Sequence, residues 1–272
     1  MLKIRVFTAA FIFLATLALL FLTPAWLFRL AVALVLMVGC WEYRRLADLP
    51  ENAGIALLVL QAFIVSGLLL TWPATSRETL ALLGGACVAW LLMFARLALY
   101  RPGRAPDARY RRLGFTSAVG GLSFALFALS WLRDQQQGPF LLLLLFLLIW
   151  AADVGAYFSG RFLGRHKLAP NISPNKTWEG AIGGMLLATA AAFVLVRLIP
   201  GLAAPPAALV LLAVATTLAS IGGDLYISIQ KRTVGIKDTG SLFPGHGGVL
   251  DRYDSLLAGA PFFAMAWAWM AP

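Results

Sequence analysis

The sequence predicts an all-α integral membrane protein with about nine transmembrane helices. Of its 272 residues, 61% are hydrophobic and 12% are charged, about half the charged fraction of a soluble domain. The apolar residues form segments long enough to cross a hydrocarbon core of about 30 Å, which takes roughly 20 helical residues. No segment alternates polar and apolar residues as the strands of a membrane barrel do. The composition therefore excludes a soluble globular enzyme.

Nine apolar segments qualify as spans, and polar loops separate them. We expect helices at 6–22, 25–41, 53–71, 79–99, 113–132, 139–160, 179–199, 206–229 and 254–271. The chain then divides into residues 1–112, with about four helices and basic cytoplasmic loops, and residues 113–272, which hold most of the polar residues suited to catalysis. The two cysteines, Cys40 and Cys87, lie inside apolar segments, where inert buried thiols are expected.

Basic residues fall on one side of the predicted membrane. One alternate set of loops holds 18 of the 22 lysines and arginines, and the other set holds three. Loops rich in Lys and Arg stay in the cytoplasm. We therefore expect a cytoplasmic N-terminus, an external C-terminus and insertion in the cytoplasmic (inner) membrane, with the lipid bilayer as surroundings. The net charge of +10 then indicates anionic lipids or nucleotides as partners, and no nucleic acid is expected.

Two features of the first half have alternative explanations. The basic, proline-containing loop 99–112 fits a topology signal in contact with anionic headgroups, and the alternative is a role in gathering an anionic substrate. At the end of the second span, the rings of Trp41 and Tyr43 fit an interfacial aromatic belt. For Glu42, between them, the sequence fits both a structural and a functional role.

The sixth span contains Asp153 at membrane depth. A carboxylate there is costly, so it should face the interior of the bundle or a polar cavity. It either forms an internal ion pair or lies in the wall of an active site. Tyr157, Ser159 and Arg161 extend its polar stripe toward the cytoplasm, which favours the active-site wall.

A turn at 173–177 runs into the seventh span. Ser173, Asn175 and Thr177 supply hydroxyl and amide groups, and a helix N-terminus attracts phosphate. Lys176 adds a full positive charge. The alternative is a simple N-cap by Thr177 or Ser173, which would not need the lysine. His166, just before this turn, fits a surface position.

The eighth span ends in a polar stripe. Ser220, Asp224, Ser228 and Lys231 share one helical face at spacings of four, four and three. Asp224 therefore approaches the cytoplasmic surface beneath a lysine. A structural Asp224 would instead pair with Lys231 or with a neighbouring helix.

Residues 228–254 are the longest polar run of the chain. They contain the cations Lys231, Arg232, Lys237 and Arg252, the acids Asp238, Asp251 and Asp254, His246, and the pair Gly247-Gly248. Glycines allow backbone N–H groups to turn toward an anion. Three carboxylates, from Asp224, Asp251 and Asp254, supply the oxygen ligands that Mg²⁺ prefers. The cluster predicts metal-dependent phosphoryl or nucleotidyl transfer at the cytoplasmic face.

This run resembles the signature of the phosphatidate cytidylyltransferases, or CDP-diacylglycerol synthases. The matching pattern is Ser228-x-x-Lys231-Arg232-x4-Lys237-Asp238-x-Gly240-x2-Phe243-Pro244-x-His246-Gly247-Gly248-Val249-x-Asp251-Arg252-x-Asp254. The segments Asp153-x-x-Ala156-Tyr157 and 173–180 are also similar to family motifs, so the resemblance covers about residues 140–272. Gln230 and Tyr253 depart from the apolar residues usual there, which affects local packing.

The resemblance implies that CTP and phosphatidic acid react to give CDP-diacylglycerol and pyrophosphate. It also implies a homodimer and a paired-cation centre of Mg²⁺ with a second cation such as K⁺, with Asp224 and Asp251 as ligands. The catalytic residues expected are Asp224, Asp251, Lys231, Lys237, Asp238, His246 and Asp254. The substrate-binding residues expected are Asp153, Arg161, Ser173, Asn175, Lys176, Ser228, Arg232, Gly247, Gly248 and Arg252.

Three other functions remain to be separated from this one. A CTP-dependent lipid kinase would use a similar loop but release CDP. A transporter fits the number of spans, although its polar residues should gather near the membrane midplane at broken helices. A structural scaffold leaves Asp153 and Asp224 without a role.

Overall fold

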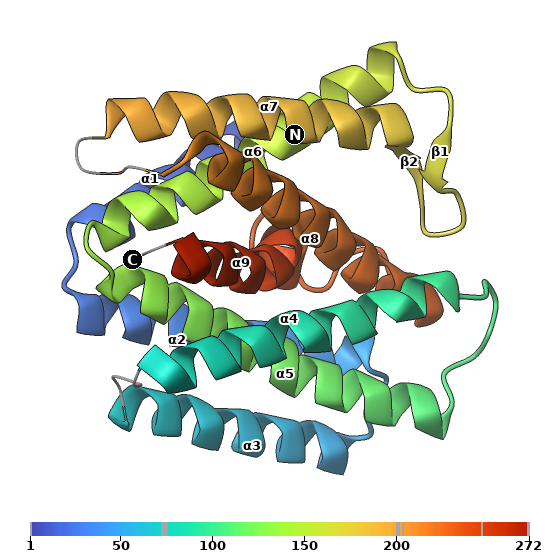
Figure 1. Cartoon of the computed structure of the whole chain (residues 1–272). Coiled ribbons are helices and arrows are strands. Elements are labelled where there is room, and N and C mark those ends of the chain that lie inside the picture. Colours follow the sequence, from blue (N-terminus) through green and yellow to red (C-terminus); the bar gives the residue numbers. More distant parts are fainter. Residues whose placement is uncertain (1, 72–75, 200–201, 203, 246, 271–272) are drawn as a thin grey trace.

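The computed structural model describes residues 2–71, 76–199, 202, 204–245 and 247–270 (Figure 1). The elements in chain order are α1 (Leu2–Phe21), α2 (Ala25–Leu46), α3 (Glu51–Leu70), α4 (Ser76–Ala98), α5 (Ala108–Asp134), α6 (Gly138–Phe162), β1 (Lys167–Ala169), β2 (Ser173–Thr177), α7 (Trp178–Leu198), α8 (Pro206–Thr233) and α9 (Leu250–Met270). Each of the nine expected segments overlaps one of these helices.

Most of the helices are suited to a bilayer. Within the described part of the chain, seven helices are long and apolar enough to cross a membrane, namely α2 to α8. In α1 the apolar stretch is shorter, Phe7–Phe21, and α9 begins with three charged residues within its first five positions. The prediction of an all-α membrane protein is confirmed.

One element differs from expectation. Residues 173–177, predicted as a turn before the seventh span, form strand β2 of a small antiparallel hairpin, in which β1 pairs with β2 and Lys167 lies opposite Thr177. Ile172, in the hairpin turn, is buried, and Leu168 packs against the same apolar cluster. These two anchors explain why the segment folds back onto the bundle.

Helix α9 lies at the centre of the bundle. It packs against α8, α5, α4, α6 and α2 (Figure 1), and residues 256–261 are buried. Small side chains allow close contact with α8, where Gly223 lies against Ala258. Helices in a bilayer associate through such close packing of small residues, since lipid tails are as apolar as the side chains themselves. The start of α9 is therefore held firmly beside the end of α8.

The N-terminal helices reach the same region. Helix α1 packs against α6, with the rings of Phe13 and Trp150 5.5 Å apart. Helix α2 contacts α5, α3 and the central α9. Residues from the first half of the chain therefore border the loop between α8 and α9.

Candidate active site

The loop between α8 and α9 folds back over the first turn of α9. A backbone hydrogen bond from Phe243 N to Gly247 O, 2.9 Å long, closes its tip. Gly247 has a φ of 83°, a left-handed conformation that glycine adopts at no steric cost. A side chain at this position would also meet the carboxylate of Asp251. The loop therefore needs glycine here in order to approach α9.

Asp251 links this loop to α8 through hydrogen bonds. Its Oδ1 accepts a hydrogen bond from Lys231 Nζ at 2.7 Å, and its Oδ2 accepts from Thr239 N at 2.7 Å and Gly248 N at 3.0 Å. The Asp251 side chain is only 4% exposed. The N–H of Gly248, expected to face a bound anion, thus points to a carboxylate of the chain itself. Asp251 therefore holds the loop in position and also lines the site.

Asp224 pairs with a different lysine. Lys176 Nζ lies 2.5 Å from Asp224 Oδ2, and Ser228 Oγ donates to Asp224 Oδ1 at 3.2 Å. The expected stripe on α8 therefore holds for Ser228, but Lys231 turns to Asp251. Strand β2 of the hairpin carries Lys176 to α8 and so makes this contact possible. Asp224 remains partly exposed, at 31%.

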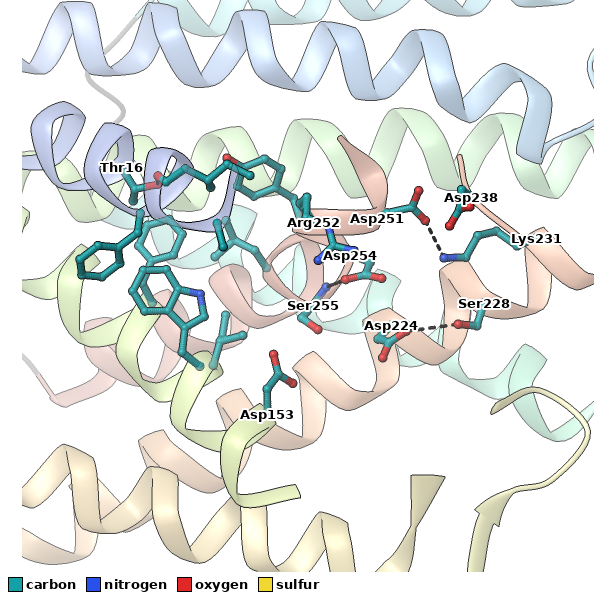
Figure 2. Close-up of a pocket in the computed structure, with 18 of the residues that line it drawn as sticks. Thr16, Asp153, Asp224, Ser228, Lys231, Asp238, Asp251, Arg252, Asp254 and Ser255 are labelled. Atoms are coloured by element: carbon teal, nitrogen blue, oxygen red, sulfur yellow. Dashed lines mark hydrogen bonds and ion pairs between the residues drawn. The ribbon is translucent and has the colours of Figure 1, made fainter. Parts of the chain in front are cut away.

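Asp224, Asp251 and Lys231 line one cavity of about 750 Å³. Figure 2 shows Asp153 of α6, Asp224 of α8 and Asp254 of α9 around its interior. The other polar residues expected from the sequence that line it are Ser228, Lys231, Arg232, Lys237, Asp238, Asp251 and Arg252. Ten candidate residues, from four parts of the chain, thus share one space.

The opposite wall of the cavity is apolar. Ala9, Ile12 and Phe13 of α1 line it together with Phe146 and Trp150 of α6. No sequence pattern placed α1 at the site. The cavity is therefore amphiphilic, with acids and cations at one end and aromatic and aliphatic side chains at the other.

Most of the remaining candidate residues line two smaller cavities. One, of about 310 Å³, is lined by Ser173, Asn175, Lys176 and Asp153. The other, of about 570 Å³, is lined by Gly247 with Lys237, Asp238 and Arg252. Each shares residues with the main cavity, Asp153 in the first case and Lys237, Asp238 and Arg252 in the second, so both lie beside it.

The remaining candidate residues have different surroundings. Arg161 donates to Tyr157 Oη at 2.6 Å and does not line the main cavity. His246 lies outside the described residues. Thr177 caps α7, with its Oγ1 accepting from Gly180 N at 3.1 Å, and the adjacent Lys176, which a cap does not need, pairs with Asp224. His166 is exposed as expected, and its Nδ1 lies 2.6 Å from Glu179.

Glu42 is the residue at this site whose role the sequence left open. Its carboxylate, 5% exposed, accepts from Thr239 Oγ1 at 2.7 Å, Val249 N at 2.9 Å and Leu250 N at 2.9 Å. The two N–H groups belong to the start of α9, so Glu42 caps this helix from α2. The carboxylate also lies against Gly248. Its only sequence signal was a charge at the edge of an apolar span.

Thr239 connects Glu42 to Asp251. Its Oγ1 lies 2.7 Å from Glu42 Oε2 and 3.0 Å from Asp251 Oδ2, and its side chain is fully buried. Glu42, Thr239, Asp251 and Lys231 thus form a continuous chain of polar contacts. Gln230, a departure from the family pattern, supports the same region by donating Nε2 to Tyr43 Oη at 2.6 Å.

The oxygen ligands in the cavity suit a hard divalent cation. The acidic ligands available are carboxylate oxygens, which Mg²⁺ binds in preference to nitrogen or sulfur. Among the described residues, no three His, Cys, Asp or Glu side chains are already gathered as a metal site. Asp224 and Asp251 are each neutralised by a lysine, Lys176 and Lys231 respectively. These carboxylates are therefore of the type that binds Mg²⁺. In the structure, lysine ammonium groups balance their charge.

Comparison with known proteins gives a consistent result. The sequence model described as "Cytidylyltransferase family" matches residues 3–270. A protein of Pseudomonas aeruginosa named "Phosphatidate cytidylyltransferase" is 39% identical over 284 aligned positions, covering 100% of both chains.

Two further relatives bear the same name. One from Brucella suis is 37% identical over 223 residues, which is 80% of this chain and 76% of the relative. One from Haemophilus influenzae is 49% identical over 142 residues. That match spans about half the length of the relative, 47%, and 48% of this chain.

Proposed function

The chain belongs to the cytidylyltransferase family, and we propose that it transfers CMP from CTP to phosphatidic acid. The products are CDP-diacylglycerol and pyrophosphate, which makes the protein a nucleotidyltransferase of phospholipid biosynthesis. The relatives named phosphatidate cytidylyltransferase support this substrate pair. The observation on which the proposal rests is the amphiphilic cavity, because one reactant is a charged nucleotide and the other a charged lipid with apolar chains.

The reaction needs little general-base catalysis. A phosphate oxygen of phosphatidic acid attacks the α-phosphorus of CTP, and the bond from that phosphorus to the bridging oxygen of the β-phosphate breaks. Pyrophosphate leaves with the electron pair. A phosphomonoester has a second pKa of about 6, so the nucleophile is already an anion at neutral pH. The obstacle is the repulsion between two anions.

The cations of the cavity counter this repulsion. Lys231, Arg232, Lys237 and Arg252 line it, and Lys176 reaches it through Asp224. We assign these cations to the triphosphate and the lipid phosphate, with Asp238, His246 and Asp254 orienting them. Positioning and charge stabilisation supply most of the rate enhancement in such transfers. The apolar wall formed by α1 and α6 would receive the start of the acyl chains.

We further propose that Asp224 and Asp251 hold Mg²⁺. Both line the cavity, and substrate phosphates can draw Lys176 and Lys231 away from them. When bound, Mg²⁺ would shield the charge between the reacting phosphates and stabilise the leaving pyrophosphate. A second cation, such as K⁺, would be held by the same carboxylates.

An assay of the purified protein with labelled CTP and phosphatidic acid tests the function. We expect labelled CDP-diacylglycerol and unlabelled pyrophosphate when the label is in the cytosine ring. We expect no turnover with a chelator present and recovery on addition of excess Mg²⁺. Release of labelled CDP with a doubly phosphorylated lipid would identify a lipid kinase instead, and binding without conversion of either reactant would favour a transporter.

We propose nine spans, a cytoplasmic N-terminus, insertion in the inner membrane and an active site open to the cytoplasm. The distribution of lysine and arginine among the loops supports this orientation. We also propose a homodimer, on the basis of the family resemblance.

Cysteine labelling tests the orientation in a background without Cys40 and Cys87. Gln136→Cys, in the exposed loop between α5 and α6, should react with an impermeant maleimide in intact spheroplasts. Ala105→Cys, between α4 and α5, should react only after permeabilisation. The reverse pattern would contradict the orientation.

A further inference from the structure

A separate cavity lies on the other side of α8. It has a volume of about 170 Å³, and its α8 wall is formed by Ile229 and Thr233. These residues lie on the helical face roughly opposite Asp224 and Ser228, which line the main cavity. The connection between α4 and α5 forms most of the remaining wall. Figure 1 shows this connection at the same end of the bundle as the C-terminal end of α8.

The cavity is strongly basic. Arg96, Arg101, Arg104 and Arg109 line it, and Asp107 is the only acid among the residues that line it. Asp107 is already engaged: it accepts from Tyr110 N at 2.7 Å as the N-cap of α5 and pairs with Arg104 at 2.6 Å. The hydrogen bond from Tyr110 N and the pairing with Arg104 lower the pKa of Asp107. The lining therefore retains an excess of positive charge at neutral pH.

Arg96 lies at the inner side of this cavity, partly buried. It donates to Tyr226 Oη at 2.6 Å, and its guanidinium lies 5.8 Å from the ring centre of Tyr110. A guanidinium has five N–H donors, and this hydrogen bond uses one. The remaining donors suit an oxygen-rich anion such as a phosphate.

The size of the cavity and the residues at its edge indicate which kind of anion it binds. A volume of about 170 Å³ is below the roughly 300–1,000 Å³ of cavities that hold drug-sized ligands, so a nucleoside triphosphate is too large. Leu99 and Leu113 also line the cavity and are 74% and 37% exposed. Leu99 directly follows the membrane-spanning helix α4. A phosphate at the arginines would therefore have apolar surface beside it at the edge of the bilayer.

We propose that this cavity binds the phosphate headgroup of an anionic phospholipid, at a site separate from the active cavity. The lipid phosphate contacts Arg96, Arg101 and Arg109, and its acyl chains run past Leu99 and Leu113. Bound lipid would hold the α4–α5 connection against the end of α8. The site takes a phosphodiester lipid that is not a substrate, so its occupancy does not depend on the proposed transfer reaction.

Lipid binding to the purified full-length protein tests the site. The probe is phosphatidylglycerol, titrated into detergent-solubilised protein and followed by native mass spectrometry. The test variant is Arg101→Gln/Arg109→Gln; both side chains are exposed. The matched control is Arg45→Gln/Arg112→Gln, which removes the same charge from exposed positions outside the cavity.

We expect the test variant to bind phosphatidylglycerol about 30-fold more weakly than wild type, which corresponds to about 2 kcal/mol for two arginines. The control should bind within about threefold of wild type. Equal weakening of both variants would mean diffuse surface attraction and would overturn the site. A second arm adds inorganic phosphate or glycerol 3-phosphate as competitor. Displacement of phosphatidylglycerol by either one at similar concentration would overturn the lipid assignment in favour of free phosphate.

Activity toward CTP and phosphatidic acid in detergent separates the two proposals. We expect the test variant and the control to turn over as wild type does, because none of the four arginines lines the main cavity. Loss of lipid binding with unchanged turnover supports the second site. An inactive wild type that still binds phosphatidylglycerol through Arg101 and Arg109 would contradict only the proposed function.

Discussion

Replacing Asp224 by asparagine is expected to remove nearly all cytidylyl transfer and to leave the protein inserted and folded. The side chain is partly exposed, at 31%, and it pairs with Lys176 and accepts from Ser228, so replacing it by an amide of the same shape disturbs little packing. Asparagine keeps the shape but supplies no negative charge for a cation. Losing one such stabilising group typically costs about 10²–10³ in rate, or about 3–4 kcal/mol. Initial rates at saturating CTP and Mg²⁺, together with the melting temperature, measure both effects.

Asp48→Asn is the matched control for this experiment. Asp48 pairs with Arg111 at 2.7 Å on the surface and has a φ of 51°, a conformation that asparagine tolerates well. An exposed pair of this kind contributes about 0–1 kcal/mol, so near wild-type activity is expected. Near wild-type turnover in Asp224→Asn would instead contradict the assignment of Asp224 to the metal.

Asp251→Asn should lose activity as well, but with a second effect. Because Asp251 accepts from Thr239, Gly248 and Lys231, its replacement also loosens the loop before α9. We therefore expect a lower melting temperature in this variant and an unchanged one in Asp224→Asn. The comparison separates the loss of a charge from the loss of the loop geometry.

Helix positions and the clustering of acids and cations could be predicted from the sequence. The helices follow from long apolar segments, because a bilayer forces the backbone to satisfy its own hydrogen bonds. The polar residues 228–254 are local in the chain, so their proximity to one another follows from the loop alone. The gathering of Asp224 and Asp251 at one cavity follows from the adjacency of α8 and α9.

The ion pairs could not be predicted in the same way. Helical spacing put Asp224 beneath Lys231, but Lys231 pairs with Asp251 and Lys176 reaches Asp224 from the β-hairpin. Helical spacing constrains neighbours on one helix and says nothing of residues on another. The position of α1 in the cavity wall likewise depends on packing against α6, which hydropathy does not encode.

Glu42 is the clearest case of a residue whose role depends on distant contacts. Its hydrogen-bond partners Thr239, Val249 and Leu250 lie 197, 207 and 208 positions away in the chain. No local pattern signals a carboxylate that caps a helix from another helix. Burial turns this distant contact into a strong constraint, since an unsatisfied buried donor costs about 1–3 kcal/mol.

Glu42→Gln is therefore expected to impair catalysis although Glu42 does not line the main cavity. The amide places N–H donors where Val249 N and Leu250 N need an acceptor, so one of these groups loses its partner. Through Thr239, the change reaches Asp251, and loss of such supporting contacts around a metal ligand typically costs about 10–100-fold in metal affinity or activity. We expect a lower kcat and a higher Mg²⁺ concentration for half-maximal activity, measured below the melting temperature of the variant.

Glu51→Gln provides the matched control, because Glu51 is exposed at the start of α3. It should leave both kcat and the Mg²⁺ requirement unchanged. The Mg²⁺ requirement is the decisive measurement for Glu42, since a purely structural role would lower the melting temperature and the amount of active protein but not the apparent affinity for Mg²⁺. Glu42→Asp keeps the charge but is shorter by one methylene, so it should restore part of the Mg²⁺ affinity. A Glu42→Gln enzyme with wild-type Mg²⁺ dependence would show that Glu42 stabilises α9 without positioning Asp251.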